Sequence, residues 1–352
     1  MKLRLKNTPE QVELIKAMAS RDGNVAREAG EAFAAFLGPV VNKVLMQAGT
    51  ASAVYTDLPF DEDDSPSIPL DLFAGEGEGY VSTWSQTVAG GLPTSTVEGF
   101  SEMKVSTYRL DSAVSFLKRY ARRGRLDVVS KAVERMANEV LIKQERNAWA
   151  VVLKALGSSG RVLEKAGGAD STFQLSMLNA LVTAVKRVNT SYAGGSTTDA
   201  YGLTDLFVSP EVKEDIRAFA YQPITTANTN LPDSVREGIY SNAGAQEIYG
   251  ISIHELIELG EGQKYQTLFN DFYSGGTWDS TTDELVIGLD LTKDAFVRPV
   301  ARQAESGGTF TALPDDQFVS RSEKIGFYGF LEEGRVCIDS RAMYGLTVSN
   351  AT

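Results

Sequence analysis

Residues 127–156 read DVVSKAVERMANEVLIKQERNAWAVVLKAL, and this stretch decides the fold of the chain. Its apolar residues recur every three or four positions, as they do along one side of an amphipathic helix. They are Val128, Val129, Ala132, Val133, Met136, Ala137, Val140, Leu141, Ala148, Trp149, Val152, Leu153 and Leu156. We expect one helix of about 45 Å at 1.5 Å per residue, with Asp127 as its N-cap and Gly157 at its end. Because ordinary helices have about eleven residues, this one indicates a long structural element more than a wall of an active site.

The composition of the chain excludes several kinds of chemistry. Its 352 residues, 43% of them apolar, suffice for one large or two medium domains. Cys337 is the only cysteine, which excludes an internal disulfide and a thiolate metal cluster and is typical of a cytosolic protein. His254 is the only histidine, which excludes metal sites that need two. The sequence holds neither an apolar run of membrane-spanning length nor a secretion signal.

The charge of the chain is unevenly distributed. The net charge of −12 disfavours a general nucleic-acid binder, although a protein can enclose nucleic acid without gripping it. Residues 44 to 103 contain no Lys or Arg, so we expect this stretch to lie in solvent or against a basic surface. Its acidic residues are Asp57, Asp61, Glu62, Asp63, Asp64, Asp71, Glu76, Glu78, Glu98 and Glu102.

A calcium loop that begins at Asp61 is the alternative interpretation of the acidic residues. It would place Pro66 where such loops need glycine and Leu72 where they need a bidentate glutamate. The sequence therefore predicts no metal site here.

Residues 79–108 have the pattern of a long β-hairpin. Residues 80–88 are strand-like, and Gly90-Gly91-Leu92-Pro93 supplies the turn. The half near the turn is rich in Ser and Thr and has no apolar face, and an isolated hairpin is only marginally stable in water. We expect it to project and to rest on another surface, with Trp84 and Gln86 among its contacts.

The dense basic block is residues 118–125, KRYARRGR, just before the long helix. Positive charge before a helix N-terminus is unfavourable with the helix dipole, so we expect an acidic partner. Contact with nucleic acid is the alternative. The predicted contacts between subunits are therefore Asp61 and Asp63 with Arg119, Arg122, Arg123 and Arg125.

The rest of the chain mixes helices and strands without βαβ alternation, which indicates an α+β protein. Capping boxes predict helix starts at 8–11 and 171–174, Gly38-Pro39 is expected to bend a helix, and Ser209-Pro210-Glu211 caps another helix. Strands are expected at 203–208, 247–257, 285–289 and 296–300, and the region 318–348 is β-rich with a turn at Gly334.

Neither His254 nor Cys337 carries a catalytic pattern. His254 alternates along a strand, Ile251–Glu255, and no Gly-x-Ser-x-Gly motif accompanies it, so a half-buried strand histidine is favoured. Cys337 lies between Val336 and Ile338 and is predicted to be a small core residue. We predict no catalytic residue, no cofactor and no metal. A cytosolic hydrolase that uses His254 is the alternative of a different class.

The order of these elements resembles the major capsid protein of tailed bacteriophages, which has the Hong Kong 97-like fold. Residues 206–212, LFVSPEV, resemble the strand-to-helix entry of the family's axial domain, and residues 247–253, EIYGISI, resemble the strand that follows it. Residues 318–321, 325–330 and 335–339, FVSR, IGFYGF and RVCID, resemble the C-terminal strands of the peripheral domain.

The resemblance implies an N-terminal arm at 1–74, an extended hairpin loop at 75–110 and a peripheral domain with a spine helix at 111–165. It further implies an axial domain at 166–294 and a return to the peripheral sheet with a C-terminal strand at 295–352. The acidic stretch begins within about sixty residues of Met1, so we expect a separate scaffolding protein in place of a fused one. Because no lysine lies between Lys43 and Lys104, crosslinking through a lysine of the loop has no donor at the hairpin tip.

The function implied by the resemblance is structural and non-enzymatic. Such a protein self-assembles as hexamers and pentamers into an icosahedral shell around phage double-stranded DNA, without sequence-specific binding and without a membrane. Its partners are the scaffolding protein, a portal protein and decoration proteins, and its location is the virion capsid, assembled in the host cytoplasm. An encapsulin-like nanocompartment shell shares the fold and is the alternative of the same class.

Overall fold

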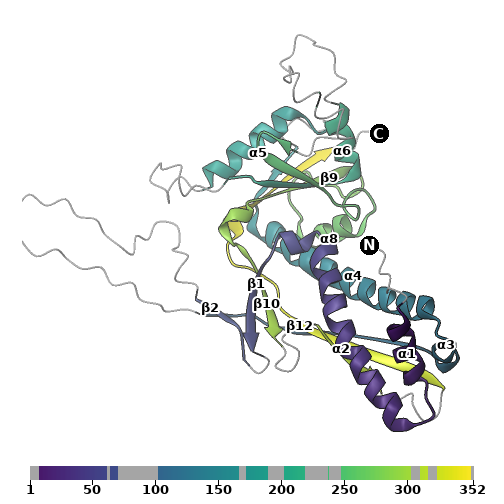
Figure 1. Ribbon diagram of the computed structural model, residues 1–352. Coiled ribbons are helices and arrows are strands. Elements are labelled where there is room, and N and C mark those ends of the chain that lie inside the picture. The colour runs from purple at the N-terminus through teal and green to yellow at the C-terminus, as the bar shows by residue number, and fades with distance from the viewer. Residues whose placement is uncertain are drawn as a thin grey trace, which may run out of the picture. The chain divides into compact units, whose positions relative to one another are not determined.

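The computed structural model of the chain describes residues 8–61, 64–69, 102–165, 172–188, 202–218, 237, 247–302, 310–315 and 323–349. The chain divides into two compact units (Figure 1). Unit 1 comprises Met1–Ser67, Lys104–Ala148 and Val297–Val336, and unit 2 comprises Ile68–Met103, Trp149–Phe296 and Cys337–Thr352. Each unit is therefore built from segments that lie far apart in the sequence.

The sheet of unit 1 is organised around β12 (Lys324–Glu333). Strand β4 (Tyr108–Leu117) pairs antiparallel with β12 over ten residues, and β11 (Thr311–Asp315) pairs with it antiparallel as well. At its Glu333 end, β12 meets β10 (Phe296–Arg302), which pairs in parallel with β1 (Thr56–Asp61). The short strand β13 (Val336–Cys337) also pairs with β10.

Two N-terminal helices, α1 (Pro9–Met18) and α2 (Gly23–Ala48), form the core of unit 1 with the sheet and with the first part of the long helix. The rings of Phe33 and Phe327 pack with their centroids 5.1 Å apart. Gly329 lies under Phe310, because a Cβ at this glycine would overlap the Phe310 ring. The N-terminal region expected as an arm therefore contributes buried side chains to a compact unit.

The sheet of unit 2 has the order β5-β14-β9-β6-β8-β7. Its strands are β5 (Val162–Glu164), β6 (Asp205–Val208), β7 (Glu247–Ile248), β8 (Ile251–Glu255), β9 (Asp283–Leu289) and β14 (Met343–Ser349). All seven residues of β9 are buried, as expected for a central strand covered on both faces. The C-terminal strand β14 thus belongs to the sheet of unit 2 and not to the sheet of unit 1.

Helices cover the sheet of unit 2 (Figure 1). One face packs on α5 (Leu175–Arg187) and α6 (Pro210–Ala218), with Leu206, Val208 and Ile253 among the buried residues. The side chain of Phe207 points to the other face and meets the ring of Trp149 at 4.8 Å. Trp149 in turn lies 6.2 Å from Tyr265 of α8 (Lys264–Phe272).

The long helix predicted from the sequence is α4 (Leu126–Ser159), which has 34 residues and runs from unit 1 into unit 2. Its apolar stripe is confirmed, since Val129, Val133, Trp149 and Leu156 are all at most 1% exposed. Its predicted ends are wrong. Asp127 lies in the first turn instead of at the N-cap, and the helix continues past Gly157 to Gly160, whose φ of +63° suits glycine.

Several local signals gave a different outcome from the one expected. Thr8 and Gln174 occupy N-cap positions of α1 and α5 without a side-chain hydrogen bond, so both capping boxes are wrong. By contrast, the helix expected to resume after Gly38-Pro39 does so, since Pro39 lies inside α2, which continues to Ala48. The strand expected over 247–257 is two strands, because Tyr249 and Gly250 both have positive φ and form a tight turn.

The base of the expected hairpin is a small two-stranded sheet of β2 (Ser67–Pro69) and β3 (Glu102–Lys104). The rest of the hairpin, including Trp84 and Gln86, lies outside the described residues. The described residues also form the 3-10 helices η1 (Ala51–Ala53), η3 (Leu291–Lys293) and η5 (Ser340–Ala342). Among the described residues, no helix combines the length and the apolar character needed to cross a membrane.

Candidate assembly surfaces

The basic block forms the short helix α3 (Lys118–Arg122) and the turn that follows it. Arg119 and Arg122 lie in the last turn of α3, where a cation is favourable with the helix dipole, so the expected conflict with the N-terminus of α4 is wrong for these two residues. The turn contains Gly124 with φ +63°, and a Cβ there would lie 2.9 Å from Cγ1 of Val12. The block is therefore packed against α1.

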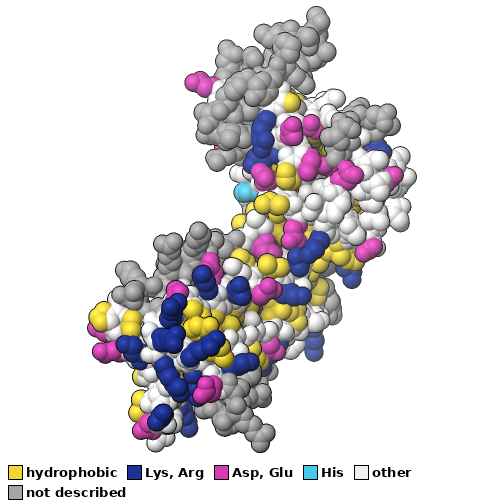
Figure 2. Space-filling view, turned by 90° about the vertical axis from the view of Figure 1, so that its right-hand side faces the viewer, with side chains coloured by type: hydrophobic (Ala, Val, Ile, Leu, Met, Phe, Trp, Pro, Cys, Tyr) yellow, Lys and Arg dark blue, Asp and Glu magenta, His cyan; other side chains and the backbone are white. Residues whose placement is uncertain are grey.

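The predicted contact residues of this block are exposed. The Arg119 guanidinium lies over the Tyr120 ring at 5.1 Å, and Arg119, Arg122, Arg123 and Arg125 all face solvent. None of these four side chains forms an ion pair with a carboxylate of the described residues. Figure 2 views the molecule from the side on which α3 lies, and Lys and Arg side chains gather in the lower part of that face.

The acidic stretch starts on β1. Asp57 forms an ion pair with Arg298 of β10 at 3.3 Å, so at this residue the stretch lies against a basic side chain, as expected. Asp61 is exposed, and in the β1–β10 register its partner is Arg302. Asp63 lies outside the described residues.

The acidic and basic surfaces of one copy lie at opposite ends of the same sheet. The acidic strand β1 pairs with β10, and β10 meets β12 at Glu333, the last residue of that strand. The basic helix α3 directly follows Leu117 of β4, which pairs with Lys324, the first residue of β12. The ten-residue ladder between these ends is about 30 Å long at 3.3 Å per residue. Asp57 and Asp61 on β1 therefore cannot pair with the basic block of their own copy.

A buried ionic network, not expected from the sequence, lies at the Glu333 end of unit 1. The Glu333 side chain is fully buried and accepts hydrogen bonds from Arg298 Nε at 2.7 Å, Gln144 Nε2 at 3.0 Å and Tyr108 Oη at 2.8 Å. Arg335 also contacts it at 3.3 Å, and its guanidinium stacks over the Tyr55 ring. Burial, followed by the Glu333 charge, raises the pKa of Tyr108 to about 12.

A second buried carboxyl lies in unit 2. Glu284 of β9 is 1% exposed and accepts a hydrogen bond from Ser209, whose Oγ also accepts from Val212 N at 3.1 Å and so caps α6 as predicted. The pKa of Glu284 is raised to about 7, mainly by burial; the Ser209 hydrogen bond lowers the pKa, and the nearby carboxylates of Glu211, Asp215 and Glu261 contribute to raising it.

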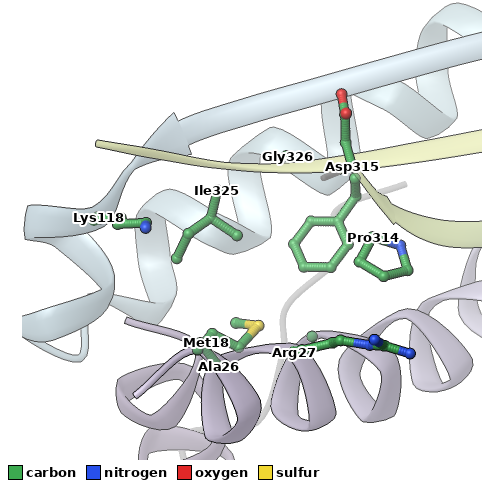
Figure 3. A pocket seen from close by; sticks show the side chains of 11 residues that line it. Met18, Ala26, Arg27, Lys118, Pro314, Asp315, Ile325 and Gly326 are labelled. Carbon is green, nitrogen blue, oxygen red and sulfur yellow. The ribbon is translucent and has the colours of Figure 1, made fainter. Parts of the chain in front are cut away.

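A pocket of about 330 Å³ opens in unit 1 between α2 and the strands β11 and β12 (Figure 3). Its apolar lining includes Met18, Ala26, Pro314, Ile325 and Phe327. Arg27 and Lys118 also line it, so the basic block borders the pocket.

The residues considered for catalysis and metal binding have contacts that are typical of structural residues. His254 is half-buried on β8 as predicted, with Nε2 2.7 Å from Asp205 and the ring stacked on Phe207. Within the described residues its ring meets no hydroxyl or thiol, so no nucleophile is paired with it. Burial raises the pKa of the Cys337 thiol to about 12. No group of three acidic, His or Cys side chains in the described ranges is placed to hold a metal ion.

Comparison with known proteins identifies the fold. No protein-family model matches the chain, and no curated protein matches its sequence. Among solved structures, the capsid of cyanophage Pam1 is similar with a TM-score of 0.51 at 12% identity, covering 85% of this chain and 89% of that one. The capsid of a native GTA particle gives 0.51 at 12% identity, covering 85% and 90%. The capsid of cyanophage P-SCSP1u gives 0.50 at 13% identity, covering 85% and 87%. The chain therefore has the α+β, Hong Kong 97-like fold of tailed-phage capsid proteins.

Proposed function

We propose that this chain is the major capsid protein of a tailed bacteriophage, which assembles as hexamers and pentamers into an icosahedral shell around double-stranded DNA. The observation that carries the proposal is the fold, which is shared with the cyanophage Pam1 capsid over 85% of the chain. Because fold alone does not determine function, the surfaces of the molecule supply further support.

The basic block supports a role in assembly. Four exposed arginines lie on α3 and the turn that follows it, while Asp57 and Asp61 on β1 of the same copy lie about 30 Å away along the sheet. A neighbouring copy can bring its own acidic stretch to the block, and we infer that Asp61 and Asp63 meet Arg119, Arg122, Arg123 and Arg125 across subunits. The hairpin residues Trp84 and Gln86 would contact a neighbour as well.

The proposal includes partners and a location. A scaffolding protein, a portal protein and decoration proteins would complete the particle, which would form in the host cytoplasm and become the virion capsid. The His254 hydrolase is not proposed, because His254 pairs with Asp205 without a nucleophile among the described residues.

Light scattering and negative-stain microscopy of the purified chain, alone and with a candidate scaffolding protein, test the proposal. We expect capsomers or closed shells. A chain that stays monomeric at high concentration under every salt and scaffold condition would contradict it. Closed particles that carry a co-purified enzyme and no DNA would instead support the encapsulin-like alternative.

A further inference from the structure

The pocket beside α3 is suited to bind apolar side chains. Its volume of about 330 Å³ is at the lower end of the range for ligand sites. Met18 and Ala26 face Ile325 and Pro314 across it (Figure 3), and Gly23 and Gly30 bring no side chain into it. It is therefore suited to a few apolar atoms.

The charged residues at the mouth of the pocket indicate which charge a bound segment carries next to its apolar side chains. Lys118 lines the pocket and begins α3, so Arg122 lies about 6 Å further along the helix axis. Asp315 also lines the pocket, but in Figure 3 its carboxylate points away from Met18 and Ala26. The surface thus presents an apolar pocket followed by cations.

One segment of the chain has the complementary order of residues. Residues 70–78 read LDLFAGEGE, with Leu70, Leu72 and Phe73 followed by Glu76 and Glu78. The carboxylates come three and five residues after Phe73, a span of about 10 to 17 Å when extended. This span is sufficient to connect an apolar pocket with a basic block beside it.

The segment begins near the end of β4 that lies away from the pocket. The chain leaves unit 1 at Ser67, next to Val105, whose N donates to Pro66 O at 3.0 Å. Six residues from Ser67 to Phe73 span at most about 21 Å. The pocket residue Ile325 pairs with Phe116 of β4. Strand β4 begins at Tyr108, shortly after Val105, and covers about 26 Å from Tyr108 to Phe116.

We propose that this pocket is a docking site for residues 70–78 of a second copy of the chain, with Leu72 and Phe73 in the pocket and Glu76 and Glu78 on the basic block. The inference rests on the proposed function, since it assigns an occupant to one assembly surface. It adds an apolar anchor to contacts that exposed charges alone would leave weak.

Binding of a labelled peptide tests the site. A fluorescent peptide of residues 68–80, titrated into the unassembled full-length chain, should bind saturably and more weakly as salt increases. Ala26→Leu fills the pocket and should weaken binding at least tenfold, whereas Ala35→Leu, exposed on the same helix, should not. Lys118→Glu should weaken binding, while Lys131→Glu, exposed on α4, should leave it unchanged.

The peptide supplies controls that do not depend on the folding of a variant. Replacing Leu72 and Phe73 by Asp should abolish binding. A peptide of residues 94–104, which has Phe100 between Glu98 and Glu102, should bind at least tenfold more weakly. Equal binding by either control peptide, or unchanged binding to Ala26→Leu, would overturn the assignment.

Crosslinking of mixed-isotope particles identifies the copy that supplies the segment. With a photoreactive residue at position 73, crosslinks to peptides that contain Met18 should join light and heavy chains. Crosslinks confined to one isotope would refute a second copy as the donor. If particles form but the peptide does not bind, only this inference fails. If the peptide binds but no particle forms, the proposed function fails.

Discussion

The carboxylate of Glu333 accepts a hydrogen bond from Arg298 Nε at 2.7 Å, and none of the Glu333 side chain is exposed. Arg298 in turn reaches Asp57 on β1, so the pair connects the N-terminal strand to the central strand of unit 1. Removing one partner from a buried ion pair leaves the other charge without compensation, which costs about 3–5 kcal/mol.

We therefore expect Glu333→Ala to lower the free energy of unfolding by about 3–5 kcal/mol, because it leaves Arg335 buried without a carboxylate and leaves Arg298 with only the more exposed Asp57. Chemical denaturation monitored by circular dichroism measures this change. Glu332→Ala, which removes one partly buried hydrogen bond with Thr107, is the matched control and should cost about 0.5–1.5 kcal/mol. Equal effects of the two variants would show that the network contributes little.

The raised pKa of Glu284 predicts how stability changes with pH. Because its folded-state pKa of about 7 exceeds the ordinary value of 4.5, the folded state binds the proton more tightly between these values. The contribution of Glu284 is therefore complete below about pH 4.5 and is lost as the pH increases through 7, by at most about 3 kcal/mol. Glu284→Gln should remove this dependence and stabilise unit 2 at pH 8. Parallel stability curves for the two proteins from pH 5 to 8 would rule out this assignment.

Charge reversal tests the proposed contact between subunits. Arg122→Glu with Arg123→Glu should impair assembly and leave the melting temperature of the subunit nearly unchanged, since both side chains are exposed. Each exposed pair contributes about 0.2–1 kcal/mol, and the effect is repeated around a shell and weakened by salt. Adding Asp61→Lys and Asp63→Lys should restore part of the assembly, as measured by light scattering. Normal assembly of the first variant would mean that the block faces DNA or solvent, and failure of the rescue would mean that Asp61 and Asp63 are not its partners.

Deletion of the hairpin turn separates folding from assembly. Removing residues 86–94 takes away polar residues without a continuous apolar face, so the variant should be soluble with normal helix content. It should not form stable shells, because the hairpin could no longer rest on a neighbour. Electron microscopy that shows particles like those of the unmodified chain would refute this role.

The thiol of Cys337 should be unreactive in the folded protein. Burial, with a further contribution from Asp339, raises its pKa to about 12, so almost no thiolate is present at pH 8. Iodoacetamide at pH 8 should modify less than a few per cent of the folded chain and all of the chain in denaturant, as read by intact mass. Rapid modification of the folded chain would contradict the assigned burial.

The elements predicted correctly are those whose signals are local. Helix α4 has its apolar stripe within one stretch of sequence, and Ser209 caps α6 through Val212 N, three residues away. The Glu333 network could not be predicted, because Gln144 and Tyr108 lie 189 and 225 residues from Glu333. The sequence predicts that the acidic stretch lies in solvent or against a basic surface, but it could not identify Arg298 as the partner of Asp57, because the two lie 241 residues apart.

The segmented construction of unit 1 has a consequence during synthesis of the chain. Strand β12, which pairs with β4, β10 and β11, lies between residues 324 and 333 of 352. A ribosome must therefore add β1, β4, β10 and β11 before the strand at the centre of this sheet exists. Chains that terminate early lack that strand and cannot present α3 and the pocket in their folded arrangement, so folding itself would keep incomplete translation products out of a growing particle.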